Sequence, residues 1–159
     1  MRLNLLVALF AALAVPAAAE GPFGLPAGYH WGDAPDPGAV AAEAERQGSE
    51  LRILLALDTA PLSDARSFTA VYCDGHGLQQ IRTATTRYHR GEVLRRFRRL
   101  LAILEGEFGP PSHGRPEVGT AYWEADAALE IWPVSKTKFM VVLIRNGPAV
   151  GECATEDPV

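Results

Sequence analysis

The clearest pattern of apolar and polar positions along the chain lies between Arg90 and Phe108. Apolar residues recur there with the three- and four-residue spacing of one helix face: Val93, Leu94, Phe97, Leu100, Leu101, Leu104 and Phe108. Gly109-Pro110-Pro111 ends the pattern, because glycine tolerates the left-handed conformation that closes a helix and proline has no N–H for a further turn. The pattern predicts a helix over Arg90–Phe108 that lies on a sheet with its apolar side.

Shorter apolar runs on both sides of this helix predict the sheet. Aromatic or small apolar residues alternate with other residues along Phe68–Cys73, which is typical of a strand. Asp74–Gly77 is expected to form a turn that leads into a second strand, so that the two strands form a hairpin. Leu51–Asp58 fits a buried strand, although a short buried helix has the same pattern. The other expected strands are Leu78–Tyr88, Thr120–Ala125, Ala128–Pro133 and Phe139–Arg145. Ser112–Gly119 is expected to be a polar loop.

The N-terminal region predicts one more helix. Asp36-Pro37 has the form of a helix start, an N-cap residue followed by proline, and the helix would run to Gln47. The segment that begins at Glu20 and precedes this helix is too apolar to be left in water, so we expect it to form an ordered arm that packs on the core. The fold class is therefore α+β: an antiparallel sheet of five or six strands with a long amphipathic helix and a short N-terminal helix packed on it. Residues 20–159 form a single domain with an extended C-terminal tail.

Residues 1–19 have the organisation of a cleavable signal peptide. Arg2 is the positive start, Leu3 to Val15 is an uncharged and mainly apolar run, and Ala17-Ala18-Ala19 supplies the small residues that signal peptidase accepts. A membrane anchor would need roughly 20 apolar residues, and the polar stretch from Glu20 interrupts any extension. The sequence predicts cleavage after Ala19, export to the periplasm or secretion, and no stable membrane insertion of the mature chain.

Net charge disfavours one class of partner. The chain has 15 basic and 19 acidic side chains, and removal of residues 1–19, in which Arg2 alone is charged, leaves 14 and 19, a formal charge of −5. Phosphate backbones attract basic proteins, so this acidic balance argues against general binding of nucleic acids.

Two cysteines, Cys73 and Cys153, remain in the mature chain. In an oxidising compartment an even pair forms a disulfide more often than two free thiols, which the sequence nevertheless leaves open. A bridge would close a loop of about 80 residues and stabilise the fold by roughly 4 kcal/mol in the chain-entropy model.

Residues with catalytic or metal-binding chemistry are scattered. No metal-ligand spacing links the four histidines, so we expect neither a metal nor a cofactor: His30, His76, His89 and His113. Cys73-Asp74-Gly75-His76 places a thiol and an imidazole within four residues, and a tight turn can bring them together. A bridged Cys73 has no thiolate, however, and we assign no catalytic residue.

Two surfaces are candidates for binding. Four arginines fall on the outer side of the predicted long helix: Arg95, Arg96, Arg98 and Arg99. Glu92 can pair with Arg96 one turn along the helix, which would make them an ordinary solvated surface. The alternative is a docking face for an anionic envelope component or protein, because guanidinium groups bind carboxylate and phosphate in paired geometry. Trp132 is the second candidate, since it points away from Ile131 and is exposed unless a second layer covers it.

Three local patterns span most of the mature chain. Phe23-Gly24 leads to Trp31-Gly32 before a helix start, the strand residue Tyr72 is followed by Asp74-Gly75 and Gly77-Leu78-x-x-Ile81, and Phe108-Gly109-x-Pro111 precedes Tyr122-Trp123. In these patterns the chain resembles small exported bacterial proteins of unknown function. The resemblance is one of fold and implies no activity.

These observations favour a soluble periplasmic or secreted protein that binds or scaffolds another envelope component without catalysis. Two alternatives remain open. One is an inhibitor or immunity-type protein that blocks an enzyme, and the other is a small hydrolase that uses Cys73 and His76. The sequence contains neither a Gly-rich phosphate loop nor a G-x-S-x-G motif, which disfavours nucleotide binding and α/β-hydrolase chemistry.

Overall fold

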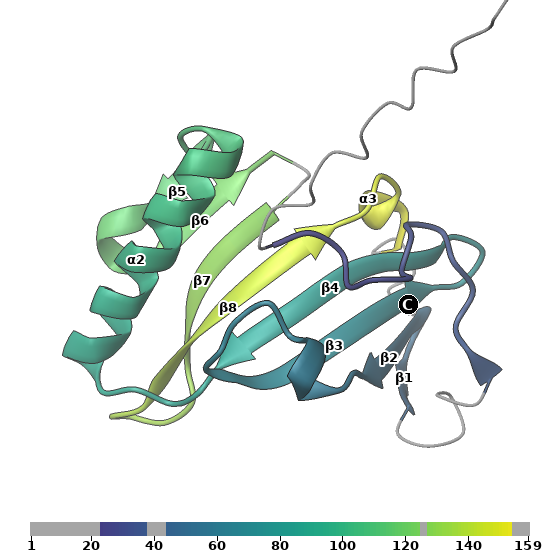
Figure 1. Ribbon diagram of the computed structural model, residues 1–159, viewed down its shortest axis with the longest axis horizontal. Coiled ribbons are helices and arrows are strands. Elements are labelled where there is room, and N and C mark those ends of the chain that lie inside the picture. The colour runs from purple at the N-terminus through teal and green to yellow at the C-terminus, as the bar shows by residue number, and fades with distance from the viewer. Residues whose placement is uncertain (1–22, 38–43, 125–126, 154–159) are drawn as a thin grey trace, which may run out of the picture.

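An antiparallel sheet of eight strands forms the body of the computed structural model, which describes residues 23–37, 44–124 and 127–153 (Figure 1). The strand order in the sheet is β1-β2-β3-β4-β8-β7-β6-β5. The strands are β1 (Ala44–Gln47), β2 (Glu50–Leu54), β3 (Ala65–Cys73), β4 (Gly77–Thr85), β5 (His113–Arg115), β6 (Thr120–Trp123), β7 (Ala127–Pro133) and β8 (Phe139–Asn146). The helical segments are η1 (Leu57–Thr59), α2 (Arg90–Phe108), η2 (Pro116–Val118) and α3 (Val150–Cys153).

The helix α2 separates two groups of sequential strands. From β1 to β4, each strand pairs with the next one along the chain. After β4, α2 carries the chain to the far edge, and β5 to β8 pair in order back toward the centre. β8 completes the sheet by pairing with β4, where Thr83 lies opposite Leu143. The two groups of strands therefore meet in one central pair.

The expectation of five or six strands with a short N-terminal helix is wrong. Ala44–Gln47, expected as the end of a helix that begins at Asp36, is the edge strand β1. The other edge strand, β5, lies in the segment expected to be a loop. Every residue of both strands is exposed, so backbone pairing holds them and no apolar pattern marks them in the sequence. Residues 38–43 of the expected helix lie outside the described residues.

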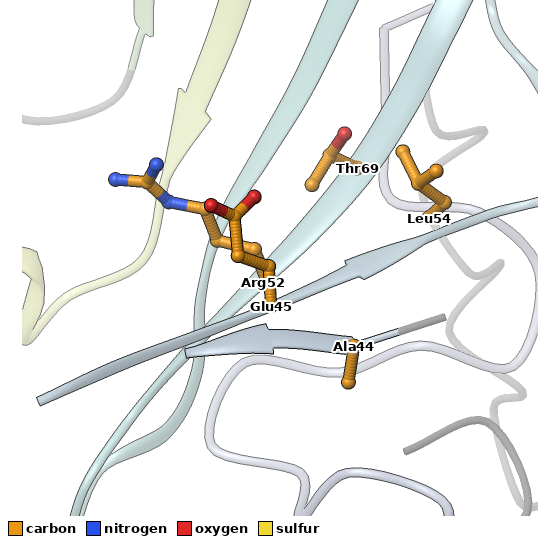
Figure 2. Close-up of a pocket in the computed structure, with 5 residues that line it drawn as sticks. All are labelled: Ala44, Glu45, Arg52, Leu54 and Thr69. Atoms are coloured by element: carbon orange, nitrogen blue, oxygen red, sulfur yellow. The ribbon is translucent and has the colours of Figure 1, made fainter. Parts of the chain in front are cut away.

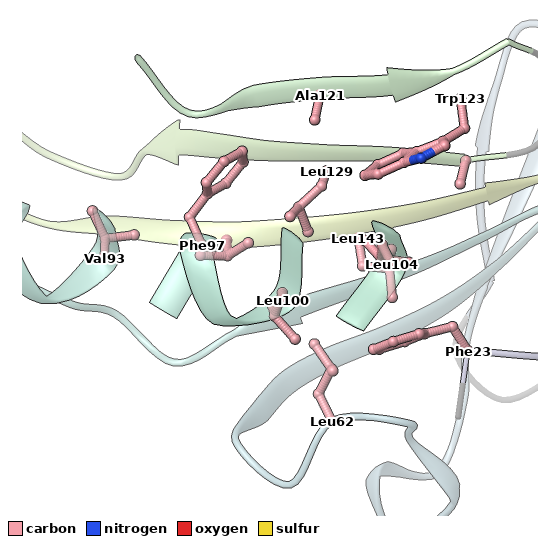
Figure 3. Close-up of a cluster of buried hydrophobic side chains, with 12 residues drawn as sticks. Phe23, Leu62, Val93, Phe97, Leu100, Leu104, Ala121, Trp123, Leu129 and Leu143 are labelled. Carbon is pink, nitrogen blue, oxygen red and sulfur yellow. The ribbon is translucent and has the colours of Figure 1, made fainter. Parts of the chain in front are cut away.

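The helix α2 has the bounds that its apolar pattern predicts, and its apolar side packs on the sheet. Four of its side chains are buried: Val93, Phe97, Leu100 and Leu104. They join a cluster that includes Ala121, Leu129 and Leu143, and Figure 3 shows Leu100 beside Leu62 in the same cluster. This contact holds the helix in one orientation and leaves its opposite side in solvent.

Side chains alternate between the two faces of the sheet along each strand, and this alternation places the cluster beneath α2 and a second core cluster on the same face. Phe68 in β3 lies opposite Thr83 in β4, which lies opposite Leu143 in β8. Directly opposed residues of an antiparallel pair point to the same side. Leu143 belongs to the cluster beneath α2, and Phe68 to the cluster beneath the N-terminal arm. Neither α2 nor the arm covers the opposite face, which we call the open face.

The N-terminal arm, residues 23–37, continues the layer that α2 begins (Figure 1). The Gly32 N–H donates to the Leu78 carbonyl at 3.0 Å, and the Leu78 N–H donates to the Asp33 carbonyl at 2.8 Å. This close approach requires glycine at position 77, because a Cβ there would lie 2.2 Å from the Gly32 oxygen. Aromatic and aliphatic side chains of the arm pack on the second cluster: Leu25, Tyr29 and Trp31.

A disulfide joins Cys73, the last residue of β3, to Cys153 in α3, in the pairing that the sequence favours. The two Cα atoms are 5.5 Å apart, and the residues are separated by 80 positions in the sequence. Such a bridge fits an extracellular, oxidising location. None of the helices in the described ranges is long and apolar enough to cross a membrane. The expected signal peptide, residues 1–19, lies outside the described residues.

We expect the double variant Cys73→Ser/Cys153→Ser to lose about 2–4 kcal/mol of the free energy of unfolding, because the bridge no longer restricts the unfolded chain. Urea denaturation followed by tryptophan fluorescence measures this loss. Wild-type protein treated with reductant is the control and should lose the same amount. A double variant as stable as the oxidised wild type would contradict the bridge.

Candidate functional site

Three exposed arginines gather on the side of α2 that faces away from the sheet. Arg95, Arg98 and Arg99 have the i, i+3 and i+4 spacing that makes helical side chains neighbours, and all three are exposed. No ion pair joins any of them to another described residue. We call these three residues the arginine face. Because the opposite side of α2 is buried, the helix presents this face in a fixed direction.

Arg96, which the sequence groups with these three, has a different environment. Its guanidinium makes two hydrogen bonds to the carboxylate of Asp64, which also accepts a hydrogen bond from the Tyr88 hydroxyl. The Arg96 and Asp64 side chains are each only 21% exposed. The expected helical partner, Glu92, instead accepts the His89 backbone N–H at 3.2 Å and completes a capping box. Arg96 therefore attaches α2 to the loop before β3.

The pKa values of this cluster follow from its burial and hydrogen bonds. Burial alone would raise the pKa of Asp64, but hydrogen bonds from Arg96 and Tyr88 and the charge of Arg96 outweigh it and lower that pKa. Burial and the hydrogen bond to Asp64 raise the pKa of Tyr88. The hydrogen bond to Asp64 raises the pKa of Arg96. The cluster therefore holds an ionised carboxylate and a neutral phenol at neutral pH, the arrangement of a structural ion pair.

Apart from Glu92 in the first turn, the charges at the two ends of α2 oppose the helix dipole. Arg90 stands in the first turn beside Glu92, and the last turn contains Glu105 and Glu107 with no basic residue. An anion near a helix C-terminus or a cation near its N-terminus opposes the dipole by about 0.3–1 kcal/mol. Helix stability therefore gives no account of why the basic residues concentrate in the first half of α2.

A pocket of about 310 Å³ lies beside the arginine face, between α2 and η2. Its lining is mainly apolar: Arg90, Val93, Leu94, Glu117, Val118, Ile131, Pro133 and Phe139. Leu94 in its wall is four residues from both Arg90 and Arg98, so these three share one stripe of the helix. Val118 is 55% exposed. We call this cavity the α2–η2 pocket.

Trp132 lies on the open face, on the opposite side of β7 from Ile131, which packs against the core cluster. The Trp132 side chain is partly exposed, and its indole N–H donates to the Glu130 carboxylate. A hydrogen bond with Glu130, together with burial, raises the pKa of Tyr122 on the neighbouring strand. The His113 ring stacks on Tyr122 at 4.9 Å. Trp132 is therefore one member of a row of polar and aromatic side chains whose polar groups bind one another.

A second hollow, of about 280 Å³, is lined by Ala44, Glu45, Arg52, Leu54 and Thr69 (Figure 2). Arg52 is paired with Glu50 at 2.7 Å. Figure 2 shows its guanidinium directed away from Leu54 and Thr69. Ligand sites combine an apolar cavity with polar groups that converge on it. This hollow lacks such convergence.

The histidines and Cys73 do not form a catalytic group. Cys73 is bridged, so its sulfur cannot form the thiolate that attacks a substrate. His76 lies 3.3 Å from a Glu152 carboxylate oxygen, and His30 lies 3.3 Å from Asp33. In the described ranges, no three metal-binding side chains come together.

Sequence reasoning missed Asp64, Tyr88 and the α2–η2 pocket. Asp64 is 32 positions from Arg96, and no local pattern links the two. The pocket depends on η2, a single turn inside the segment expected to be a loop.

In its described residues, this is a disulfide-bonded protein built on an eight-stranded antiparallel sheet, with a long helix that presents an arginine face. Comparison with protein-family models, curated proteins and solved structures finds no match to this chain.

Asp64→Asn is expected to lower the free energy of unfolding at neutral pH by about 1.5–3 kcal/mol, the range for hydrogen bonds to charged groups. The folded state lowers the pKa of Asp64. The stabilisation of the fold by ionised Asp64 is therefore complete above the unfolded-state pKa and is lost as the pH falls through the folded-state pKa. The difference between wild type and variant should shrink as the pH falls below about 5. Urea denaturation across this range measures it.

Asp58→Asn is the matched control, because Asp58 is an exposed aspartate on η1. It should change stability by less than about 0.5 kcal/mol. An Asp64→Asn difference that stays constant over the pH range would exclude the ionised carboxylate as its source.

Proposed function

We propose that this protein is exported to the periplasm or secreted, and that it binds an anionic component of the cell envelope through its arginine face, without catalysis. The observation that carries the proposal is the exposure of Arg95, Arg98 and Arg99 on one rigid side of α2, without an ion-pair partner among the described residues. Guanidinium groups in such a set bind carboxylate or phosphate in paired geometry.

Arg96 supports this proposal by contrast. Asp64 pairs with Arg96, and Glu92 caps the helix. Neither carboxylate therefore pairs with an arginine of the arginine face. The other three arginines face solvent and have no ion-pair partner among the described residues. A concentrated positive surface on a chain of formal charge −4 attracts an anionic partner to that surface alone.

The disulfide between Cys73 and Cys153 supports export. The predicted signal peptide, residues 1–19, points to the same destination. The bridged Cys73 and the separated histidines disfavour the alternative of a Cys/His hydrolase.

The test reverses the arginine face with Arg95→Glu, Arg98→Glu and Arg99→Glu. On immobilised polyglutamate, the wild-type protein should be retained and eluted by salt, whereas the triple variant should bind at least about tenfold more weakly, because the paired contacts become repulsions. Elution salt and equilibrium affinity are both measured. Circular dichroism shows whether the variant remains folded.

The control variant, Arg66→Glu/Arg115→Glu/Lys136→Glu, changes net charge by the same amount at three other exposed positions. It should be retained nearly as well as the wild type. Equal loss of binding in the two triple variants would attribute the effect to overall charge and refute a localised face.

A further inference from the structure

We infer that the partner of the arginine face is an acidic protein segment with one large apolar side chain, and that this side chain inserts into the α2–η2 pocket. This inference rests on the proposed function and names the chemistry of the partner.

The stripe of α2 that borders the pocket has the order Arg90, Leu94, Arg98. Residues four apart lie above one another on a helix, so a basic side chain stands on each side of the apolar one. Arg90 and Leu94 line the pocket, and Arg98 belongs to the arginine face. A complementary segment therefore has an apolar residue at its centre and carboxylates on both sides of it.

The pocket has the size and lining of a site for a single side chain. Its volume of about 310 Å³ is at the lower end of the range for small-ligand sites. Leu94, Ile131 and Phe139 are partly exposed, and Val118 is 55% exposed, so apolar surface of the lining remains in water. An aromatic side chain that covered this surface would serve as a buried anchor, with the charged contacts around it.

The wall formed by η2 is already in place without a partner. Gly119 has a φ of 93° and packs so closely on β7 that a Cβ there would lie 2.4 Å from the Ile131 Cδ1 atom. The Ile131 N–H donates to the Gly119 carbonyl at 2.8 Å. A pocket with a fixed wall binds its ligand without first ordering a loop, which favours affinity.

Glu117 makes the pocket selective among anionic partners. It is the one carboxylate in the lining and stands on η2, across from the arginines of α2. A uniformly anionic surface, such as a phospholipid membrane, would face both Glu117 and an apolar cavity that its head groups cannot fill. A protein segment can place acidic residues toward α2 and a neutral residue toward η2.

The experiment uses the mature chain and two synthetic peptides of equal length, rich in glutamate, with Phe or Ala at the central position. Fluorescence anisotropy measures the binding of each labelled peptide. The Phe peptide should bind at least tenfold more tightly than the Ala peptide. Val118→Asp should abolish this preference, because a charged group in the lining opposes burial of an aromatic ring there. Ile103→Asp is the matched control: Ile103 is 46% exposed on α2 but does not line the pocket, so the preference should persist.

Equal affinity for the two peptides, both lost in the arginine-face variant, would overturn the anchor and retain the proposed function. Failure of both peptides to bind would overturn the inference, and failure of phosphatidylglycerol vesicles to bind as well would overturn the proposed function with it. Phosphatidylglycerol vesicles form the last arm. Vesicle binding stronger than that of the Phe peptide and unaffected by Val118→Asp would assign the face to lipid and overturn the inference.

Discussion

The apolar side of α2 packs against β7 and β8, and this contact determines how the rest of the molecule is arranged. Phe97, Leu100 and Leu104 are almost completely buried between helix and sheet. Because these side chains hold the helix in one rotational setting, the arginine face points away from the sheet. The same setting brings Leu94 to the edge of the α2–η2 pocket. A helix free to rotate would not keep a charged surface and an apolar pocket side by side.

A second contact, between Arg96 and Asp64, attaches the flank of α2 to the loop before β3. It joins the helix to the strand group on the far side of the central β4–β8 pair. Arg96 therefore has a structural role. The exposed arginines next to it differ from Arg96 only in the direction in which the helix orients their side chains. Chemically identical side chains between Arg95 and Arg99 therefore divide into an internal attachment and a surface available to a partner.

The sheet itself is covered unevenly. One face carries two core clusters under α2 and the N-terminal arm, while the open face carries paired charges and hydrogen-bonded aromatic residues. Both edge strands are short, exposed and rich in charged or glycine residues. Such edges discourage pairing with another sheet. The side that bears α2 therefore combines the exposed positive charge and the apolar cavity on which recognition is proposed.

The sequence by itself determined the bounds of α2 and the residues on its buried side, because helical periodicity is a local property of about 19 consecutive positions. It also favoured the pairing of Cys73 with Cys153, since the chain has no other cysteines. Only the tertiary structure decided that Ala44–Gln47 is an edge strand and that Arg96 pairs with Asp64. Both depend on partners brought together by the fold: β2 pairs with the backbone of β1, and Asp64 comes from a loop distant in sequence. Exposed edge strands and long-range ion pairs leave no periodic pattern, so their places follow from the assembled sheet.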